Sequence, residues 1–243
     1  MKRLKELTSD MSFSNDDLLH PTVSNAEKKV GFHDTKINHQ VSLLHATFEK
    51  LSDEQIWKNF KLGDESAFTY IYYQYFAVLC RYGSQFLGAH SQVKDHIHDL
   101  FIELSDRRAR LSDTTSIKFY LMRSLKNRIL ADKKRSNKLA SEEDQEKGFS
   151  FEISFSIEHT IIDKQATEER NQKLNKAIKT LTKRQRELIF YYYFEELKIE
   201  EIMVLMDFSN EKSLQNLLYK SIHTLRNHFG TAISLLLISL LSF

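Results

Sequence analysis

Two features of this 243-residue sequence predict an all-α fold, and a third excludes wholesale disorder. The chain has one proline and six glycines, too few for the frequent turns of a strand-rich protein. Apolar residues recur at spacings of three and four over long stretches, which is the period of a buried helix face. Hydrophobic residues make up 41% and charged residues 28%, as in ordinary globular proteins, which excludes wholesale disorder. We expect two small helical domains joined by an acidic linker.

Changes in composition divide the chain into four segments. Residues 1–45 are polar, lack a sustained apolar period and contain the only proline, so we expect a loosely ordered extension. A first domain is expected over 46–138. Residues 139–173 carry nine acidic against four basic side chains, which indicates a linker, with one short element around 151–157. A second apolar-periodic block, 174–243, forms the second domain.

The first two helices of the first domain have recognisable start signals. Ser52 is expected to cap the first helix, because its hydroxyl accepts from free backbone amides and Gln55 lies three residues on. Gly63 and Asp64 break the apolar pattern, and a longer, aromatic-rich helix follows from Ser66.

Two further helices complete the first domain. One is expected from about Ser91 to Arg108, with an apolar stripe made of Val93, Ile97, Leu100, Phe101 and Leu104. The other is IKFYLMRSLKNRILADKKRSNK, which has seven basic side chains against one acid between residues 119 and 138. Such a helix is either a solvated basic face or a nucleic-acid-binding face.

The second domain is expected to contain a helix-turn-helix. Its elements are LNKAIKTL, KRQRELIFYYYFEEL, IEEIMVLM and EKSLQNLLYKSIHTLRNHF. The last two, separated by DFS, have the arrangement that seats a recognition helix in the major groove. On that last helix the core stripe is Leu214, Leu217, Leu218 and Leu225.

The outward face of the last helix carries the side-chain types that contact base edges and phosphates. These outward residues are Lys212, Ser213, Gln215, Asn216, Tyr219, Lys220 and His223. A merely solvated face is the alternative, but passive helices carry mostly Glu and Lys pairs. The cations expected to clamp the DNA backbone are Lys179, Lys183, Arg184 and Arg186.

Taken together, these stretches resemble bacterial RNA polymerase sigma factors of the sigma-70 family, in the compact extracytoplasmic-function branch. GDESAFTYIYYQYF is similar to the opening of the family's first conserved domain, and VKDHIHDLFIEL to its polymerase-binding helix. FYLMRSLKNRILADKKR is similar to the promoter −10 helix. The block from LTKRQRELIF to SIHTLR resembles the fourth-region helix-turn-helix that reads the −35 element. The resemblance covers about residues 53–138 and 174–228.

The resemblance implies three sets of binding residues. Polymerase contacts are expected from Asp95, His98, Asp99, Phe101 and Ile102. Contacts to −10 DNA are expected from Arg123, Lys126, Asn127, Lys133, Lys134 and Arg135. The −35 element is expected to be read by the outward face of the last helix. The segment Leu111 to Tyr120 is expected to capture unstacked bases, and the acidic linker to thread the polymerase channel or to serve as a plain tether.

Four positions depart from the family pattern. His98 stands where glutamine is usual, and Ser105 where tryptophan is frequent. In the helix-turn-helix, Met203 replaces a small residue and Asp207 a glycine. Aspartate tolerates left-handed backbone better than most residues, so we expect the turn to survive.

Catalytic and metal chemistry find little support in the sequence. His96 and His98 point apart at a two-residue spacing, and no Gly-rich phosphate loop or nucleophile–base pairing is evident. The single Cys80 excludes a disulfide framework, is expected to be a packed thiol, and fits a reducing cytoplasm. The amino-terminal residues lack the apolar core of a signal peptide. We therefore expect a cytoplasmic protein that is not an enzyme and has no cofactor, metal or small-molecule substrate.

The carboxy-terminal tail TAISLLLISLLSF is apolar and uncharged. From His228 it has too few residues for the roughly 20 needed to span a bilayer, so internal packing or partner binding is favoured over membrane association. An anti-sigma factor is one candidate partner.

The predicted function is a promoter-specificity subunit that binds core RNA polymerase and promoter DNA. Two alternatives are an ordinary helix-turn-helix regulator with an amino-terminal sensing or dimerisation domain, and a helical adaptor that binds only protein. Co-purification with core polymerase distinguishes the first alternative, and salt-dependent DNA affinity the second.

Overall fold

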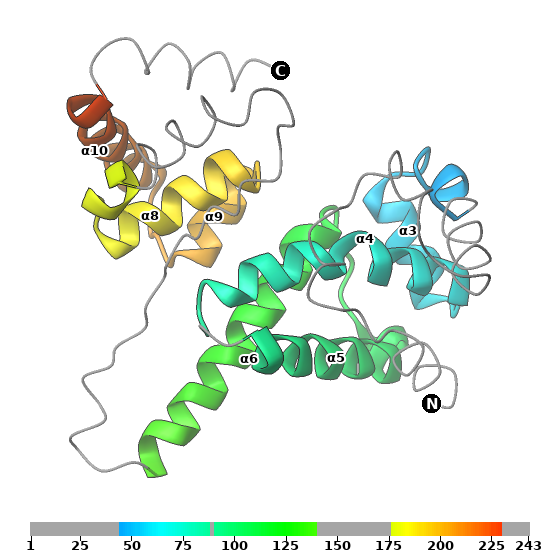
Figure 1. Ribbon diagram of the computed structural model, residues 1–243. Coiled ribbons are helices and arrows are strands. Elements are labelled where there is room, and N and C mark those ends of the chain that lie inside the picture. Colours follow the sequence, from blue (N-terminus) through cyan, green and yellow to red (C-terminus); the bar gives the residue numbers. More distant parts are fainter. Residues whose placement is uncertain (1–43, 88–89, 140–175, 230–243) are drawn as a thin grey trace, which may run out of the picture. The chain divides into compact units, whose positions relative to one another are not determined.

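The computed structural model describes residues 44–87, 90–139 and 176–229, and all regular structure in these ranges is helical (Figure 1). This confirms the predicted all-α class. The chain divides into two compact units, Met1–Glu142 and Glu143–Phe243. Most of the predicted extension, linker and apolar tail lies outside the described residues.

In the described ranges 44–87 and 90–139, the amino-terminal unit contains helices joined by short turns. They are α3 (Asp53–Lys61), α4 (Glu65–Ser84), α5 (His90–Arg107), the short η3 (Arg108–Arg110) and α6 (Ile117–Leu139). Helices α4, α5 and α6 pack against one another pairwise, and α3 packs against α4 and α6 (Figure 1). A helical turn at 44–48 precedes α3.

The helix starts follow the signals in the sequence. Ser52 and Gln55 form a reciprocal capping box at α3, which confirms the predicted cap. Gly63 has a φ of 96°, a left-handed conformation that glycine adopts without strain. The Asp64 carboxylate then accepts from two amides of α4, so the helix begins at Glu65, one residue before the predicted start.

The core of the amino-terminal unit is rich in aromatic side chains. Trp57 packs against Phe60 and Tyr120, with ring centroids 5.2 and 4.7 Å apart. The predicted stripe of α5 is buried in full, so its interpretation as a core face is confirmed. Helix α6 contributes the fully buried side chains Ile117, Leu121, Met122, Leu125 and Ile129. Because aromatic side chains bury large apolar areas, they supply much of the burial in this core.

The carboxy-terminal unit contains the predicted helix-turn-helix elements. Its helices are a helical stretch at 176–180, α8 (Lys183–Ile189), a π-helical turn η5 (Phe190–Phe194), α9 (Ile199–Leu205) and α10 (Glu211–Phe229). Helix α10 contacts both α8 and α9. A core cluster joins the first helical stretch, α8 and α10 through Ala177, Ile178, Leu181, Ile189 and Leu225.

The predicted single helix KRQRELIFYYYFEEL is α-helical only as far as Ile189. It then widens into η5, where the amide of Glu195 donates to the carbonyl of Phe190 at 3.0 Å. The four consecutive side chains from Leu188 to Tyr191 are all buried. An unbroken apolar run has no one-sided period, so the apolar pattern did not indicate where the regular α-helix ends.

Candidate functional site

Helix α10 presents the polar face predicted from the sequence. Asn210 caps the helix, because its side-chain oxygen accepts from the amide of Ser213 at 2.8 Å. The predicted contact residues are all exposed: Lys212, Ser213, Gln215, Asn216, Tyr219 and Lys220. Tyr219 is 70% exposed, and its ring centroid lies 6.3 Å from that of His223 on the same face.

The opposite face of α10 fastens it to its unit. Leu214 and Leu225 are buried, and Leu217 and Leu218 are partly buried, in agreement with the predicted core stripe. Ser221 is also fully buried, and its hydroxyl donates to the carbonyl of Leu217 at 2.7 Å. This bond satisfies a polar group that the apolar pattern did not place in the core.

The turn between α9 and α10 has a left-handed residue at the position that is usually glycine. Asp207 has a φ of 53°. The next amide, of Phe208, donates back to the carbonyl of Met203 at 2.9 Å. This six-to-one bond is characteristic of the Schellman motif, which ends a helix and redirects the chain. The expectation that aspartate preserves this turn is confirmed.

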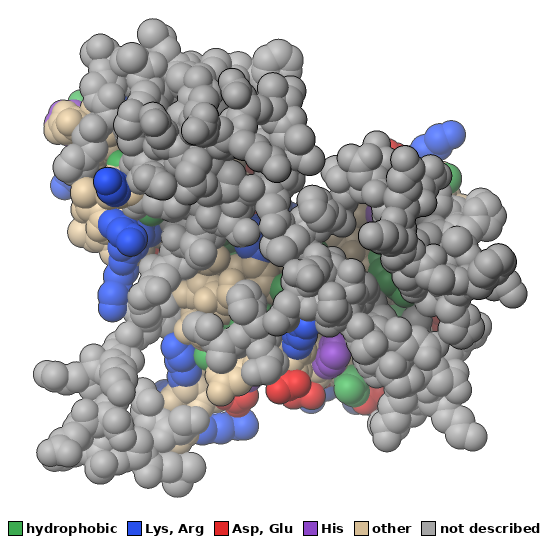
Figure 2. Space-filling view, in the orientation of Figure 1, with side chains coloured by type: hydrophobic (Ala, Val, Ile, Leu, Met, Phe, Trp, Pro, Cys, Tyr) green, Lys and Arg blue, Asp and Glu red, His purple; other side chains and the backbone are tan. Residues whose placement is uncertain are grey.

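Helix α6 carries the second basic face. Among the predicted DNA contacts, Arg123, Asn127, Lys134 and Arg135 are exposed, and Lys126 is half-buried. In Figure 2, Lys and Arg side chains lie over the part of the surface where Figure 1 places the lower half of α6. Spacings of three and four place Arg123, Asn127 and Lys134 on one side of the helix.

Lys133 differs from these residues, and the expectation that it contacts phosphate is corrected. Its side chain is half-buried and its ammonium donates to the backbone carbonyl of Phe86 at 2.7 Å. Burial disfavours the charged form and lowers the pKa of Lys133 below its usual value. The ammonium therefore holds α6 against the end of α4, a role that the charge pattern alone did not indicate.

Helix α5 presents an acidic outer face. Asp95, Asp99 and Ile102 are exposed, whereas His98 is half-buried against the rings of Phe76 and Tyr72. Desolvation lowers the pKa of His98, and the nearby carboxylates of Asp95 and Asp99 oppose that effect. The three exposed residues are accessible to a partner, whereas the side chain of His98 is accessible only in part.

Phe101 is not part of this outer face, and its assignment as a polymerase contact is corrected. The side chain is 0% exposed. Its ring lies edge-on to Tyr72, with centroids 4.8 Å apart, and near Phe68 at 6.0 Å. Phe101 belongs to the apolar stripe of α5, so it positions the exposed residues from inside the core.

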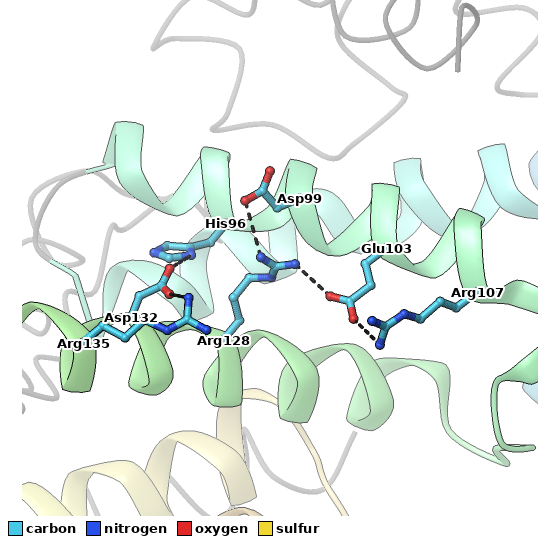
Figure 3. A network of polar contacts seen from close by, with 7 residues as sticks. All are labelled: His96, Asp99, Glu103, Arg107, Arg128, Asp132 and Arg135. Carbon is cyan, nitrogen blue, oxygen red and sulfur yellow. Dashed lines mark hydrogen bonds and ion pairs between the residues drawn. The ribbon is translucent and has the colours of Figure 1, made fainter.

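A network of charged side chains lies between α5 and α6 (Figure 3). Arg128 of α6 reaches Glu103 at 2.9 Å and Asp99 at 3.4 Å. Asp132 lies 3.5 Å from His96 and 3.6 Å from Arg135. In the sequence, Arg128 is one of the seven basic residues between positions 119 and 138, with no separate role indicated. Its partners lie 25 and 29 positions away in the chain, so no local pattern predicted them.

The segment before α6 is held by bonds from α3. The Asp53 carboxylate accepts from the amide of Ile117 at 2.7 Å, and the indole of Trp57 donates to the carbonyl of Ser112 at 2.9 Å. The expected base-capturing segment is therefore partly helical, since α6 begins at Ile117. Tyr120 is half-buried against Trp57, and Asp113 of this segment pairs with Lys61 of α3 at 2.6 Å.

Cys80 is a buried thiol, as expected from its aromatic surroundings. Burial raises its pKa to about 11, so the thiol stays protonated and unreactive near neutral pH. Within ranges 44–87, 90–139 and 176–229, His, Cys, Asp and Glu form no group of three that could hold a metal ion.

No helix among the described residues combines the length and apolar character needed to cross a bilayer. The predicted tail contact with a partner or with the body of the protein falls on residues 230–243, outside the described part of the chain.

No model of a known protein family matches the chain, and no curated protein matches it.

Proposed function

We propose that this protein is a promoter-specificity subunit of bacterial RNA polymerase, similar to the extracytoplasmic-function branch of the sigma-70 family. In this proposal it is a cytoplasmic, non-catalytic protein without a cofactor. Core RNA polymerase and promoter DNA are its partners, and an anti-sigma factor is a candidate partner for the apolar tail.

One observation carries the proposal: each compact unit has a helix whose exposed face suits nucleic acid. In the carboxy-terminal unit this is α10, which follows the Schellman turn at the end of α9. In the amino-terminal unit it is α6, whose exposed side chains include Arg123, Lys134 and Arg135. A single-site regulator needs only one such helix, whereas recognition of two promoter elements needs both.

The chemistry of α10 supports direct reading of base edges. Gln215 and Asn216 carry amides, which make bidentate contacts to adenine in the major groove. Lys212 and Lys220 lie on the same exposed side and suit phosphate contacts. Gln215 also donates to Glu211 at 2.6 Å, so its amide is partly oriented before any DNA binds.

The acidic face of α5 supports a protein partner rather than DNA, because carboxylates repel phosphate. Asp95, Asp99 and Ile102 combine charge with an exposed apolar side chain. We assign these three exposed residues to polymerase binding and leave out Phe101, which is buried in the core.

Transcription by core polymerase tests which unit reads which element. The Gln215→Ala and Asn216→Ala double variant should lose discrimination among −35 sequences, with about 1–3 kcal/mol per contact. Lys134→Ala and Arg135→Ala should instead weaken −10 engagement and each lower the salt slope of binding by about one. These positions are exposed, so circular dichroism should show an unchanged fold. A double variant that still discriminates −35 sequences like the parent contradicts the assignment of α10.

Charge reversal on α5 tests polymerase binding. Asp95→Arg is the informative variant, because Asp99→Arg also removes an ion pair with Arg128 inside the protein. Glu54→Arg, at an exposed acid of α3, is the matched control for charge reversal. We expect Asp95→Arg, but not the control, to weaken assembly with core polymerase in gel filtration. Equal assembly of both variants contradicts the assignment of this face.

The main alternative remains a helix-turn-helix regulator that acts without core polymerase. The same exposed face of α10 suits that function equally well. Sequence-specific DNA binding by the protein alone, together with no assembly with core polymerase, would favour the regulator.

A further inference from the structure

Arg184 joins α8 to the turn between the two helices of the helix-turn-helix. It lies in the first turn of α8, after the capping residue Thr182. One nitrogen of its guanidinium donates to the carbonyl of Met206 at 2.9 Å. The same group lies over the ring of Phe208, 4.5 Å from the ring centroid. The side chain therefore contacts the residue before Asp207 and the residue after it, although Met206 lies 22 positions away in the sequence.

These contacts engage two groups of the turn, the carbonyl of Met206 and the ring of Phe208. Met206 ends α9, and its carbonyl is one of the last four of that helix, which have no partner within the helix. A cation beside those carbonyls also complements the negative end of the helix dipole. Arg184 thus satisfies the end of α9 and stacks on the residue that follows the left-handed position.

The direction of α10 depends on this turn. After Phe208, only Ser209 separates the stacked ring from Asn210, the cap of α10. Helix α8, which carries Arg184, packs on α10 through the buried Ile189 and Leu225 cluster. Helix α8 therefore contacts α10 directly through its apolar side chains and contacts the preceding turn through Arg184.

We propose that Arg184 is a positioning residue that orients α10 for base reading, a role that rests on the proposed function of α10. This assignment replaces the sequence expectation that Arg184 clamps the DNA backbone. The two roles predict opposite behaviour. A positioning residue affects discrimination between sequences, whereas a phosphate ligand affects all sequences alike and contributes to the salt slope.

Three variants separate these roles in promoter binding by polymerase assembled with the full chain. Arg184→Ala should lower the preference for matched over mismatched −35 sequences by about three- to tenfold and leave the salt slope unchanged. Arg184→Lys should not restore that preference, because an ammonium cannot stack and donate in the planar geometry of a guanidinium. Lys176→Ala, at an exposed cation of the 176–180 helical stretch to which no DNA contact is assigned, is the control and should keep the preference.

Hydrogen exchange at the amides of residues 207–213 supplies a readout that does not depend on DNA. Arg184→Ala should accelerate exchange there by several-fold, and Phe208→Leu should have a similar, non-additive effect. Unchanged exchange in Arg184→Ala overturns the proposal. So does a salt slope lowered by about one with full rescue by lysine, which identifies a phosphate ligand. If the parent itself shows no −35 preference, the proposed function and the base-reading role of Arg184 both fail, and exchange then shows only whether the turn contact exists.

Discussion

At the scale of single residues, the same basic side chain serves different purposes according to its neighbours. Lys134 is exposed, whereas the adjacent Lys133 points its ammonium at the carbonyl of Phe86. Arg128 bridges to two carboxylates of α5. A count of positive charge along α6 therefore overestimates the charge that is available to DNA.

The first prediction contrasts the two adjacent lysines of α6. Lys133→Ala should lower the free energy of unfolding of the amino-terminal unit by about 1 kcal/mol, because a partly buried carbonyl loses a charged donor. Lys134→Ala should change it by less than about 0.5 kcal/mol. Urea denaturation followed by the fluorescence of Trp57, the only tryptophan, measures this unit. Equal stability of the two variants would show that the Lys133 contact contributes nothing.

The second prediction concerns His98 and pH. Desolvation holds its pKa below the ordinary value of 6.5, with Lys94 acting in the same direction and Asp95 and Asp99 against it. As pH falls through about 6.5, the unfolded chain takes up the proton first, so the stability contributed by neutral His98 is complete above this pH and declines below it.

Comparison of His98→Gln with the parent isolates this contribution among the ten histidines. The urea midpoint of the parent should fall more steeply than that of the variant between about pH 7.5 and 5.5. Parallel curves for the two proteins would contradict the prediction.

At the scale of elements, the close approach of α4 and α5 depends on a missing side chain. Gly83 lies in the last turn of α4, and a Cβ built on it would lie 2.5 Å from Cγ1 of Val93. Real Cβ atoms do not come this close to a neighbour, so the stiff, β-branched side chain of Val93 or one of the two helices would have to shift. The glycine thereby sets the distance between the helix that carries the aromatic core and the helix that carries the acidic face.

The third prediction is that Gly83→Ala destabilises the amino-terminal unit despite the higher helix propensity of alanine. Overpacking costs about 1–3 kcal/mol, which exceeds the gain of about 1 kcal/mol from propensity. In a Val93→Ala background the clash disappears, so the same change should be neutral or stabilising. Trp57 fluorescence in urea again measures the effect. A stabilising effect in the parent background would mean that the two helices are not held at this distance.

At the scale of the whole molecule, the net charge of +2 hides a strongly uneven distribution. Basic side chains lie on α6 and α10, and acidic side chains lie on α5 within the same compact unit as α6. In Figure 2, acidic and histidine side chains lie beside the basic ones in the region of α5 and α6. Under the proposed function, DNA and a basic protein surface would be attracted by separate faces of the molecule instead of by its total charge.

The fourth prediction follows from the division into two units. Asn216→Ala and Lys134→Ala lie on exposed helix faces of different units, so their effects on promoter binding should add in free energy. A double-mutant cycle, measured as transcription from one promoter with both elements intact, checks this expectation. A coupling energy above about 0.5 kcal/mol would mean that the two faces do not act independently.

The sequence alone determined where most helices of the described residues lie, how the helix that starts at Asp53 is capped, and which side of α10 faces outward. These features depend on signals within a few residues of each other: the Ser52 and Gln55 pair, the Gly63 turn and the leucine spacing of α10. Local backbone preferences and helical periodicity are sufficient to fix them.

Only the tertiary structure decided the roles of Phe101, Lys133, Arg128 and Arg184. Periodicity identifies the apolar side of a helix, but the width of the buried stripe depends on what packs against it, and so Phe101 lies inside. The polar partners of the three cations come from residues at least 22 positions away. Whether a charge binds its own protein or a partner depends on distances between helices, which no local pattern in the sequence contains.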